Sequence, residues 1–331
     1  MSHELEHAAW DTAVGGEDLA GERWSHWAHH DVAVLADGRL VVPDPRGGLA
    51  VLAGGVVVDR IETDTNEIHG ITVVVDDGAE CLWLADCGFT MVRGEGGGFE
   101  PGQRVRRGPR AVEIALDGRE LASIKVPRDH AAYESATFLP TSVAVDELRL
   151  GGSGDIWVAD GYGAGLVHRF SAEGALLSTL TGTEGAGRFD TPHAVFLDRR
   201  RSPAELLVAD RGNARIQVFS LDGRFLRCVG DGVLTSPSAF AIHGDHLVVA
   251  ELQARVVLID LEDRLVGELG SDPSVTARPG WPNALDPGGL EVRPPLAATS
   301  FNSPHGLAVD AGGNLFISEW LIGGRTVRLS P

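Results

Sequence analysis

Apolar and polar residues alternate in short runs along most of the chain, and the pattern is clearest over residues 191–229. Four apolar runs occur there, at 194–197, 205–209, 214–220 and 224–229, with the turn sequences RRSP, DRGN and LDG between them. Runs of this length, bounded by Gly, Pro, Asn and Asp, are typical of β-strands. The segment predicts a meander of four short strands, which is too small to bury its own apolar faces.

Six copies of the first two strands recur, at 30–44, 69–86, 141–160, 193–210, 238–251 and 305–319. Each copy has a polar start residue, an apolar run, a turn, a second apolar run and a closing carboxylate, which is Asp44, Asp86, Asp160, Asp210, Glu251 or Glu319. A third strand follows in every copy. This pattern predicts an all-β fold, a six-bladed β-propeller. A β-sandwich would explain the alternation but not the sixfold register.

The last repeat ends at Pro331, directly after its third strand. We expect residues 10–23 to supply the missing outer strand and to close the ring, because an open sheet edge is otherwise left. The repeats run through nearly the whole sequence, so we expect residues 1–331 to form a single domain.

Two long segments interrupt the repeats. Residues 87–110 contain five arginines and are rich in glycine, and residues 271–300 contain six prolines. We expect 87–110 to be a mobile, locally basic loop and 271–300 to be a long irregular connection. In a meander, they leave the sheets on the face where the start residues lie, which places them above the same mouth.

Net charge, apolar content and cysteine count limit the partners and the compartment that we expect for this chain. The formal net charge of −19 argues against nucleic acid and anionic membranes as partners. The sequence has no long apolar run and begins without a secretion-signal pattern, and its three cysteines imply no disulfide framework. We therefore expect a cytoplasmic monomer that acts on a small molecule or a short peptide-like substrate.

The six start residues carry candidate chemistry: His30, His69, Thr141, His193, Ser238 and His305. His69, His193 and His305 come from alternate repeats, so in a six-bladed ring their imidazoles would converge on one point. Three neutral imidazoles with an open position form a zinc site of the catalytic type. We expect His30 to line the pocket, although it remains a possible fourth ligand. The six carboxylates are expected to be structural and to accept backbone N–H bonds in their turns.

These residues carry a family resemblance. PTSVAV with DIWVADGY (140–162), TPHAVFL with LLVADRGNARIQVF (191–219) and SPHGLAVD (303–310) resemble the NHL-type propeller. More narrowly, they resemble peptidyl-α-hydroxyglycine amidating lyase, the lyase domain of peptidylglycine α-amidating enzymes. The VAD-G-N-RIQVF pattern is general to NHL repeats, whereas the alternate histidines together with the DGY sequence are more specific.

The resemblance implies that His69, His193 and His305 bind a catalytic zinc. It implies that Tyr162 is a base near the metal and that Arg46, the nearest match to a family arginine, contributes to the site. In the family, this site cleaves an α-hydroxyglycine carbinolamide to an amide and glyoxylate. The family also holds a structural calcium, but Gly306 stands here in place of its aspartate ligand, which argues against calcium.

Three functions follow from these observations. The first is a zinc-dependent lyase acting on a small hydroxylated or carbinolamide-type substrate. The second is a metal-dependent hydrolase of the lactonase kind on the same fold, although such enzymes usually hold calcium with oxygen ligands. The third is a non-enzymatic NHL scaffold that binds a partner protein.

Overall fold

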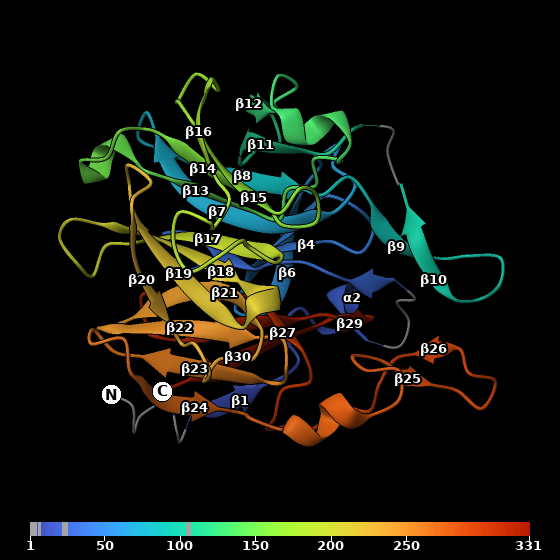
Figure 1. Cartoon of the computed structure of the whole chain (residues 1–331). Coiled ribbons are helices and arrows are strands. Elements are labelled where there is room, and N and C mark those ends of the chain that lie inside the picture. The colour runs from blue at the N-terminus through green and yellow to red at the C-terminus, as the bar shows by residue number, and fades with distance from the viewer. Residues whose placement is uncertain (1–4, 6–7, 22–25, 104–106) are drawn as a thin grey trace. The chain divides into compact units, whose positions relative to one another are not determined.

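A computed structural model describes residues 5, 8–21, 26–103 and 107–331 of the chain. The chain is built almost entirely of β-strands in four-stranded sheets (Figure 1). It forms two compact units, which are described separately: residues 1–67, 89–106 and 238–331 make unit 1, and residues 68–88 and 107–237 make unit 2. Residues 22–23 of the expected closing segment and residues 104–106 of the basic loop lie outside the described residues.

Unit 2 contains three antiparallel sheets, which are the second, third and fourth repeats of the sequence. Their strands are β7 (Ile68–Asp76), β8 (Ala79–Asp86), β11 (Arg110–Ala115) and β12 (Glu120–Ile124); β13 (Ser142–Val145), β14 (Ile156–Asp160), β15 (Leu166–Phe170) and β16 (Leu176–Leu180); and β17 (Pro192–Asp198), β18 (Glu205–Asp210), β19 (Arg215–Ser220) and β20 (Phe225–Val229). Each sheet follows the chain order, so every repeat is the meander that its hydrophobic pattern predicts.

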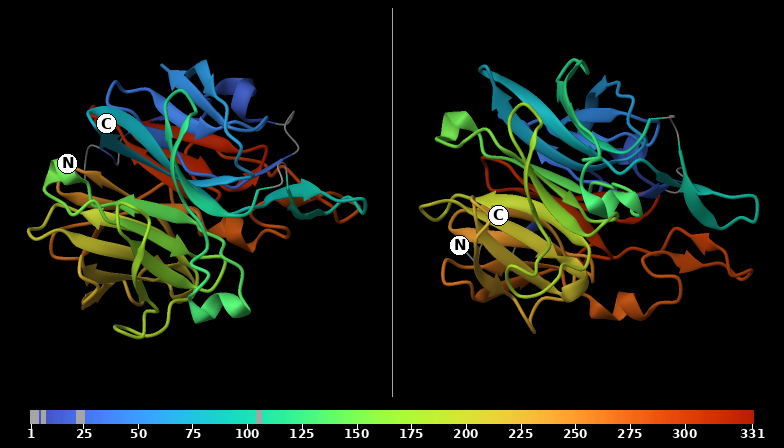
Figure 2. Two further views of the ribbon diagram at one scale, coloured as in Figure 1. Left: turned by 90° about the horizontal axis from the view of Figure 1, so that it is seen from above. Right: turned by 45° about the horizontal axis from the view of Figure 1, so that its top comes forward.

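The sheets of unit 2 pack face to face, because each sheet has two apolar faces that its own strands cannot cover. Trp83 of the first sheet and Val158 of the second share one buried cluster, and Trp157 and Leu206 share the next. The first strands β7, β13 and β17 lie side by side in this unit, which Figure 2 shows from two further directions. Their start residues are thereby brought together.

Unit 1 contains the remaining three repeats. Their strands are β3 (Ala33–Val34), β4 (Leu40–Pro43), β5 (Leu49–Ala53) and β6 (Val56–Ile61); β21 (Pro237–His243), β22 (His246–Glu251), β23 (Arg255–Ile259) and β24 (Leu265–Leu269); and β27 (Pro304–Val309), β28 (Leu315–Glu319) and β30 (Arg325–Ser330). The same kind of packing joins them: Val248 and Ile317 share one buried cluster, and Phe316 and Val42 share another.

The N-terminal segment supplies the fourth strand of the last repeat. Strand β1 (Ala9–Asp11) pairs antiparallel with β30, with Trp10 opposite Leu329. It begins one residue before the range expected from the sequence. The open edge of the last sheet is covered in this way, and the Trp10 ring packs 4.9 Å from that of Phe301. Closure of all six sheets into one ring stays a prediction.

The sequence predicts a loop over 87–110, but part of this segment forms strands. Strands β9 (Thr90–Arg93) and β10 (Phe99–Gly102) form a hairpin, which joins β2 (Trp27–Ala28) and β29 (Leu321–Ile322) in a sheet that the repeat pattern does not reveal. The hairpin is ordered because Met91 pairs with Trp27 in this sheet and the Phe99 ring packs edge-on against Trp27, at 5.5 Å.

The second long segment is more regular than its prolines suggest. It contains a 3-10 helix, Pro273–Ala277, and the two short paired strands β25 (Ala284–Leu285) and β26 (Glu291–Val292). The guanidinium of Arg93 donates to the carbonyl of Glu291 at 2.7 Å, so the two long segments contact each other, as expected from the meander (Figure 2). No helix among the described residues is long and apolar enough to cross a membrane.

Candidate functional site

Four of the start residues share one structural role, in which the side chain bonds the backbone at the next first strand: His69, Thr141, Ser238 and His305. In unit 2, Nδ1 of His69 lies 2.7 Å from the Thr141 carbonyl, and the Thr141 hydroxyl donates to the Pro192 carbonyl at 3.3 Å. In unit 1, the Ser238 hydroxyl donates to the Pro304 carbonyl at 3.0 Å. The equivalent sequence positions of these residues therefore correspond to equivalent side-chain-to-backbone hydrogen bonds in the structure.

Two imidazoles and a phenol meet in unit 2. The Tyr162 hydroxyl lies 3.1 Å from Nε2 of His69 and 3.2 Å from Nε2 of His193. The two imidazole rings are 4.7 Å apart, and both histidines are buried. Two start residues, from repeats two and four, thus meet at the hydroxyl of repeat three.

The hydrogen bonds of His69 fix its tautomer. A backbone carbonyl only accepts, so Nδ1 of His69 must carry the proton that it shares with Thr141. In the neutral ring, Nε2 then holds a lone pair directed at Tyr162. Metal-binding histidines have this arrangement, in which one ring N–H is held by a backbone carbonyl and the other nitrogen is left to ligate. The donor set of unit 2 therefore fits a metal ion.

A second pair of buried imidazoles lies in unit 1. The rings of His29 and His305 are 4.6 Å apart. Nδ1 of His305 lies 3.0 Å from the carbonyl of His30, which also accepts from the Ser318 hydroxyl at 2.8 Å. The same tautomer argument applies, and Nε2 of His305 holds a lone pair. This pair is built like the one in unit 2.

Two neighbouring histidines, His29 and His30, relate to His305 in different ways. The side chain of His29 lies against the His305 ring, whereas His30 orients His305 through its backbone carbonyl. The sequence analysis expects His30, at the start register, to line the pocket and leaves its ligation open. His29 was missed because the short strand β2 ends at Ala28, directly before it, and the pairing of β2 with β9 and β29 leaves no trace in the repeat pattern.

Tyr162 is positioned by a turn that has no room for larger residues. A Cβ added at Gly161 would lie 2.6 Å from the carbonyl of Pro192, and one at Gly70 would lie 2.7 Å from the carbonyl of Thr141. The backbone N–H of Tyr162 donates to the Leu139 carbonyl at 3.3 Å. These close approaches hold the Asp-Gly-Tyr turn against the first strands of neighbouring repeats.

An arginine not foreseen from the sequence contacts Tyr162. The Arg211 guanidinium donates to the Tyr162 hydroxyl at 3.4 Å, and its centre lies 5.5 Å from the centre of the tyrosine ring. Arg211 lies in the DRGN turn. The sequence analysis interprets this turn as a general feature of NHL repeats and not as part of a functional site. A cation at this place stabilises negative charge on the phenolic oxygen.

Arg46 lies in unit 1 and forms a two-pronged ion pair with Asp44. Its Nε and NH2 atoms are each 2.8 Å from a carboxylate oxygen of Asp44, and 45% of its side chain is exposed. The same carboxylate accepts from Arg60 at 3.0 Å. Participation of Arg46 in the site stays a prediction.

A buried network supports the turn of Tyr162 from behind. The Tyr133 hydroxyl donates to Asp160 at 2.7 Å and lies 2.6 Å from Nε2 of His168, whose Nδ1 lies 2.8 Å from the Thr179 hydroxyl. The single proton of Tyr133 goes to Asp160, so Nε2 of His168 donates to the phenol. Burial raises the pKa of Asp160, and it lowers the pKa of His168 to about 3.

Replacing His168 by glutamine is expected to flatten the acid side of the stability profile. Unfolded histidine takes up a proton below about pH 6.5, while folded His168 stays neutral until about pH 3. The free energy of unfolding therefore falls in this window as the pH drops, by up to about 1.4 kcal/mol per pH unit. The raised pKa of Asp160 acts in the opposite direction and is present in both proteins. Urea unfolding at pH 7, 6 and 5 measures the difference, and parallel profiles would contradict it.

The closing carboxylates are structural where their bonds are seen. Asp44, Asp86 and Asp160 each accept a backbone N–H from their own turn, at 2.7 to 2.9 Å, as the sequence predicts. Asp210 and Glu319 accept instead from the backbone that precedes their repeat's first strand, at 2.8 and 2.6 Å. They tie the start of each repeat to its second strand and hold the start residues in register.

An aromatic cluster in unit 1 adjoins His29. The Trp320 ring stacks on Trp27 at 5.2 Å, lies 5.5 Å from the His29 ring and meets Trp281 edge-on at 6.4 Å. Trp281 belongs to the long segment 271–300, and Trp27 pairs with Met91 of the β9–β10 hairpin. Both long segments therefore contact the aromatic cluster beside His29. The sequence predicts only that the two segments lie above the same mouth.

Comparison with curated proteins supports the resemblance seen in the sequence. The chain is 38% identical over 117 residues to NHL repeat-containing protein 3 of Homo sapiens, a match covering 32% of each chain. It is 27% identical over 183 residues to a probable peptidyl-alpha-hydroxyglycine alpha-amidating lyase of Caenorhabditis elegans, covering 54% of this chain and 46% of the relative. The matches thus span less than half of these relatives. No family model matches the sequence.

Solved structures agree on the fold. A streptogramin B lyase structure aligns over 99% of this chain and 100% of its own, with a TM-score of 0.56 and 13% identity. A catalytically inactive histidine-to-alanine variant of virginiamycin B lyase from Staphylococcus aureus, with quinupristin, aligns over 98% and 100%, with a TM-score of 0.58 and 11% identity. Identities this low speak for the fold alone. The chain therefore has NHL-repeat relatives and an all-β fold of the β-propeller type.

Proposed function

We propose that this protein is a metal-dependent lyase, with zinc as the metal, that cleaves a small carbinolamide-type substrate at the site of His69, His193 and Tyr162. The observation that carries the proposal is the convergence of two buried imidazole nitrogens on one phenolic hydroxyl, at 3.1 and 3.2 Å. The partial sequence match to a probable amidating lyase supports the reaction class.

The ligand set proposed for the metal is His69, His193 and His305, with His29 as a fourth candidate. All four are buried, and each offers one ring nitrogen. The proposal includes closure of the six sheets into one ring of blades, because a ring would bring the two imidazole pairs to a common point. Nitrogen-only ligands favour zinc over calcium, which prefers oxygen.

A bound zinc ion would supply Lewis-acid polarisation of a substrate oxygen. The protein's own groups then handle the proton. Tyr162, entering as the phenolate, takes the proton of the substrate hydroxyl and becomes a neutral phenol, the carbon–nitrogen bond breaks with its electron pair moving to nitrogen, and the new carbonyl forms at the carbon. Tyr162 returns the proton to the nitrogen, which leaves as an amide. Atoms and charge balance without a further reactant.

Arg211 stabilises the phenolate form of Tyr162, which the proton transfer requires in this scheme. Its guanidinium already donates to the phenolic oxygen at 3.4 Å, so no rearrangement is needed to bring a cation there. A preorganised donor of this kind is worth most where water is excluded. With zinc bound, Nε2 of His69 and Nε2 of His193 would ligate the metal and no longer bond the phenol.

The test of the proposed function is glyoxylate release from an N-acyl-α-hydroxyglycine by the purified chain. We expect release above the spontaneous rate, its loss after chelation and its return with added zinc. Equimolar primary amide should appear with the glyoxylate. Hydrolysis of lactones in place of this cleavage would support the hydrolase alternative and contradict the lyase.

Substitution of Arg211 by methionine is expected to lower turnover by about 10- to 100-fold while the metal is retained, because one charge-stabilising donor is lost. Arg46→Met is the paired variant, since its guanidinium is held by Asp44 in the other unit. A drop for Arg46→Met as large as that for Arg211→Met would assign Arg46 to the site as well. Unchanged turnover in Arg211→Met would remove Arg211 from it.

A further inference from the structure

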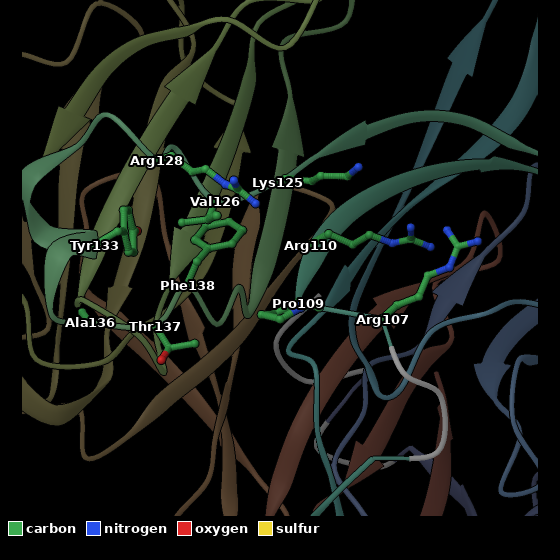
Figure 3. A pocket seen from close by; sticks show the side chains of 11 residues that line it. Arg107, Pro109, Arg110, Lys125, Val126, Arg128, Tyr133, Ala136, Thr137 and Phe138 are labelled. Atoms are coloured by element: carbon green, nitrogen blue, oxygen red, sulfur yellow. The ribbon is translucent and has the colours of Figure 1, made fainter.

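A cationic cavity lies in unit 2, apart from the two imidazoles. It has a volume of about 740 Å³ and is formed where β11 begins, where β12 ends and along the connection to β13 (Figure 3). Four of its lining side chains are cations and none is acidic: Arg107, Arg110, Lys125 and Arg128. Concentrated positive charge is unusual in a chain of net charge −19.

Two of the four cations of the cavity pair with a described acidic side chain and two do not. Glu120 lies 3.3 Å from Arg110 and 3.8 Å from Arg107, and its one charge is shared by both. Lys125 and Arg128 are exposed, and no described acidic side chain forms an ion pair with either of them. Cations gathered in a concave site focus a field that attracts anions.

The remaining walls are mainly apolar, with Tyr133 and Thr137 as the polar side chains. Val126, Pro109 and the buried ring of Phe138 line the cavity beside the cations (Figure 3). Tyr133 packs edge-on against Phe138 at 5.8 Å, and its hydroxyl is held by Asp160. A wall held in this way loses little freedom when a ligand binds.

We propose that this cavity is a binding site for a small organic anion that carries two or three negative charges on a planar, apolar body. The volume is within the range of pockets that take small molecules, which are mostly apolar with a few placed polar groups. The arginines present paired donors that suit carboxylate and phosphate groups equally, so the shared chemistry is an oxyanion on an aromatic scaffold.

Calorimetric titration of the full chain tests the proposal with four probes. Two have the same kind of body and different anions, 2,6-naphthalenedicarboxylate and 1-naphthyl phosphate, and two have no apolar body, citrate and inorganic phosphate. We expect saturable binding of at least one naphthalene anion, and the tighter of the two identifies the oxyanion class. Citrate or phosphate binding as tightly as both naphthalene anions would overturn the apolar part of the proposal, and no saturable binding would overturn all of it.

Paired variants tie the binding to this cavity. Lys125→Gln with Arg128→Gln removes two charges without breaking an ion pair seen in the structure, and should weaken binding at least about tenfold. Arg188→Gln with Arg224→Gln removes two exposed charges elsewhere in the same unit and should change it less than about twofold. Equal losses in both double variants would show attraction by net charge alone and overturn the site.

Chemical labelling of lysine gives an independent measurement of ligand binding in the cavity, because Lys125 is the single lysine of the sequence. Acylation of the chain by an amine-reactive ester, followed by peptide mass spectrometry, reports on this one side chain. The bound naphthalene anion should slow labelling of Lys125 and leave labelling of the N-terminal amine unchanged. Undiminished labelling of Lys125 at saturating ligand would place the ligand elsewhere.

Discussion

Replacing His193 by alanine is expected to remove the metal and abolish turnover while leaving the fold intact. The imidazole of His193 is buried, and its Nε2 faces the same hydroxyl as Nε2 of His69. Loss of a direct ligand should weaken metal binding by more than the 10- to 100-fold typical of changes to groups that only orient ligands. Elemental analysis after dialysis should fall from about one equivalent of zinc to a small fraction.

The control for this variant is His246→Ala, which removes a partly exposed imidazole outside the ligand set. It should keep both zinc and turnover. The variants His69→Ala and His305→Ala extend the test to both units, since the proposal has one ion held by both pairs. If His193→Ala keeps its full zinc content but loses turnover, His193 is not a zinc ligand. Its role would then be limited to its contact with Tyr162.

The scaffold was predictable from the sequence because every repeat uses the same local physics. Alternation of apolar residues sets the strands, and turn residues end them within one or two positions of the observed bounds. The start register was also readable, and the bonds of Thr141 and Ser238 to the next strand give its cause. Asp44, Asp86 and Asp160 accept N–H groups of their own turns as predicted, whereas Asp210 and Glu319 accept from the backbone before the first strand.

Features made by contacts between distant segments were not predictable. The sheet of β10, β9, β2 and β29 joins four pieces of chain, and β2 and β29 are only two residues long, so no periodicity marks them. His29 depends on that sheet and was missed with it. Arg211 was overlooked for another reason, since a residue in a general NHL turn gains its chemistry only from the tyrosine that a neighbouring repeat places beside it.

Tyr162→Phe is expected to lower turnover by about 10²- to 10⁴-fold, the usual contribution of a positioned acid–base group. Phenylalanine keeps the ring that packs against His69 and His193, at 5.1 and 5.9 Å, and removes only the hydroxyl. Zinc content should be unchanged, because the proposed ligands are imidazole nitrogens. Steady-state glyoxylate release with a parallel zinc assay measures both quantities.

The chain's other tyrosine is the matched control. Tyr133→Phe leaves Asp160 and His168 without the phenol between them and should cost about 1–3 kcal/mol of stability, the price of a broken buried hydrogen bond. Its effect on turnover should be much smaller than that of Tyr162→Phe. If Tyr162→Phe retains normal turnover, the proton transfer belongs to another group and Tyr162 only packs.

The central claim is that imidazoles from both units hold one ion. Anomalous X-ray diffraction from crystals of the zinc-loaded protein, recorded on both sides of the zinc absorption edge, tests it most directly. We predict one strong peak about 2.0–2.1 Å from ring nitrogens of His69, His193 and His305. A peak bound to other residues, or none at these histidines, would contradict the account.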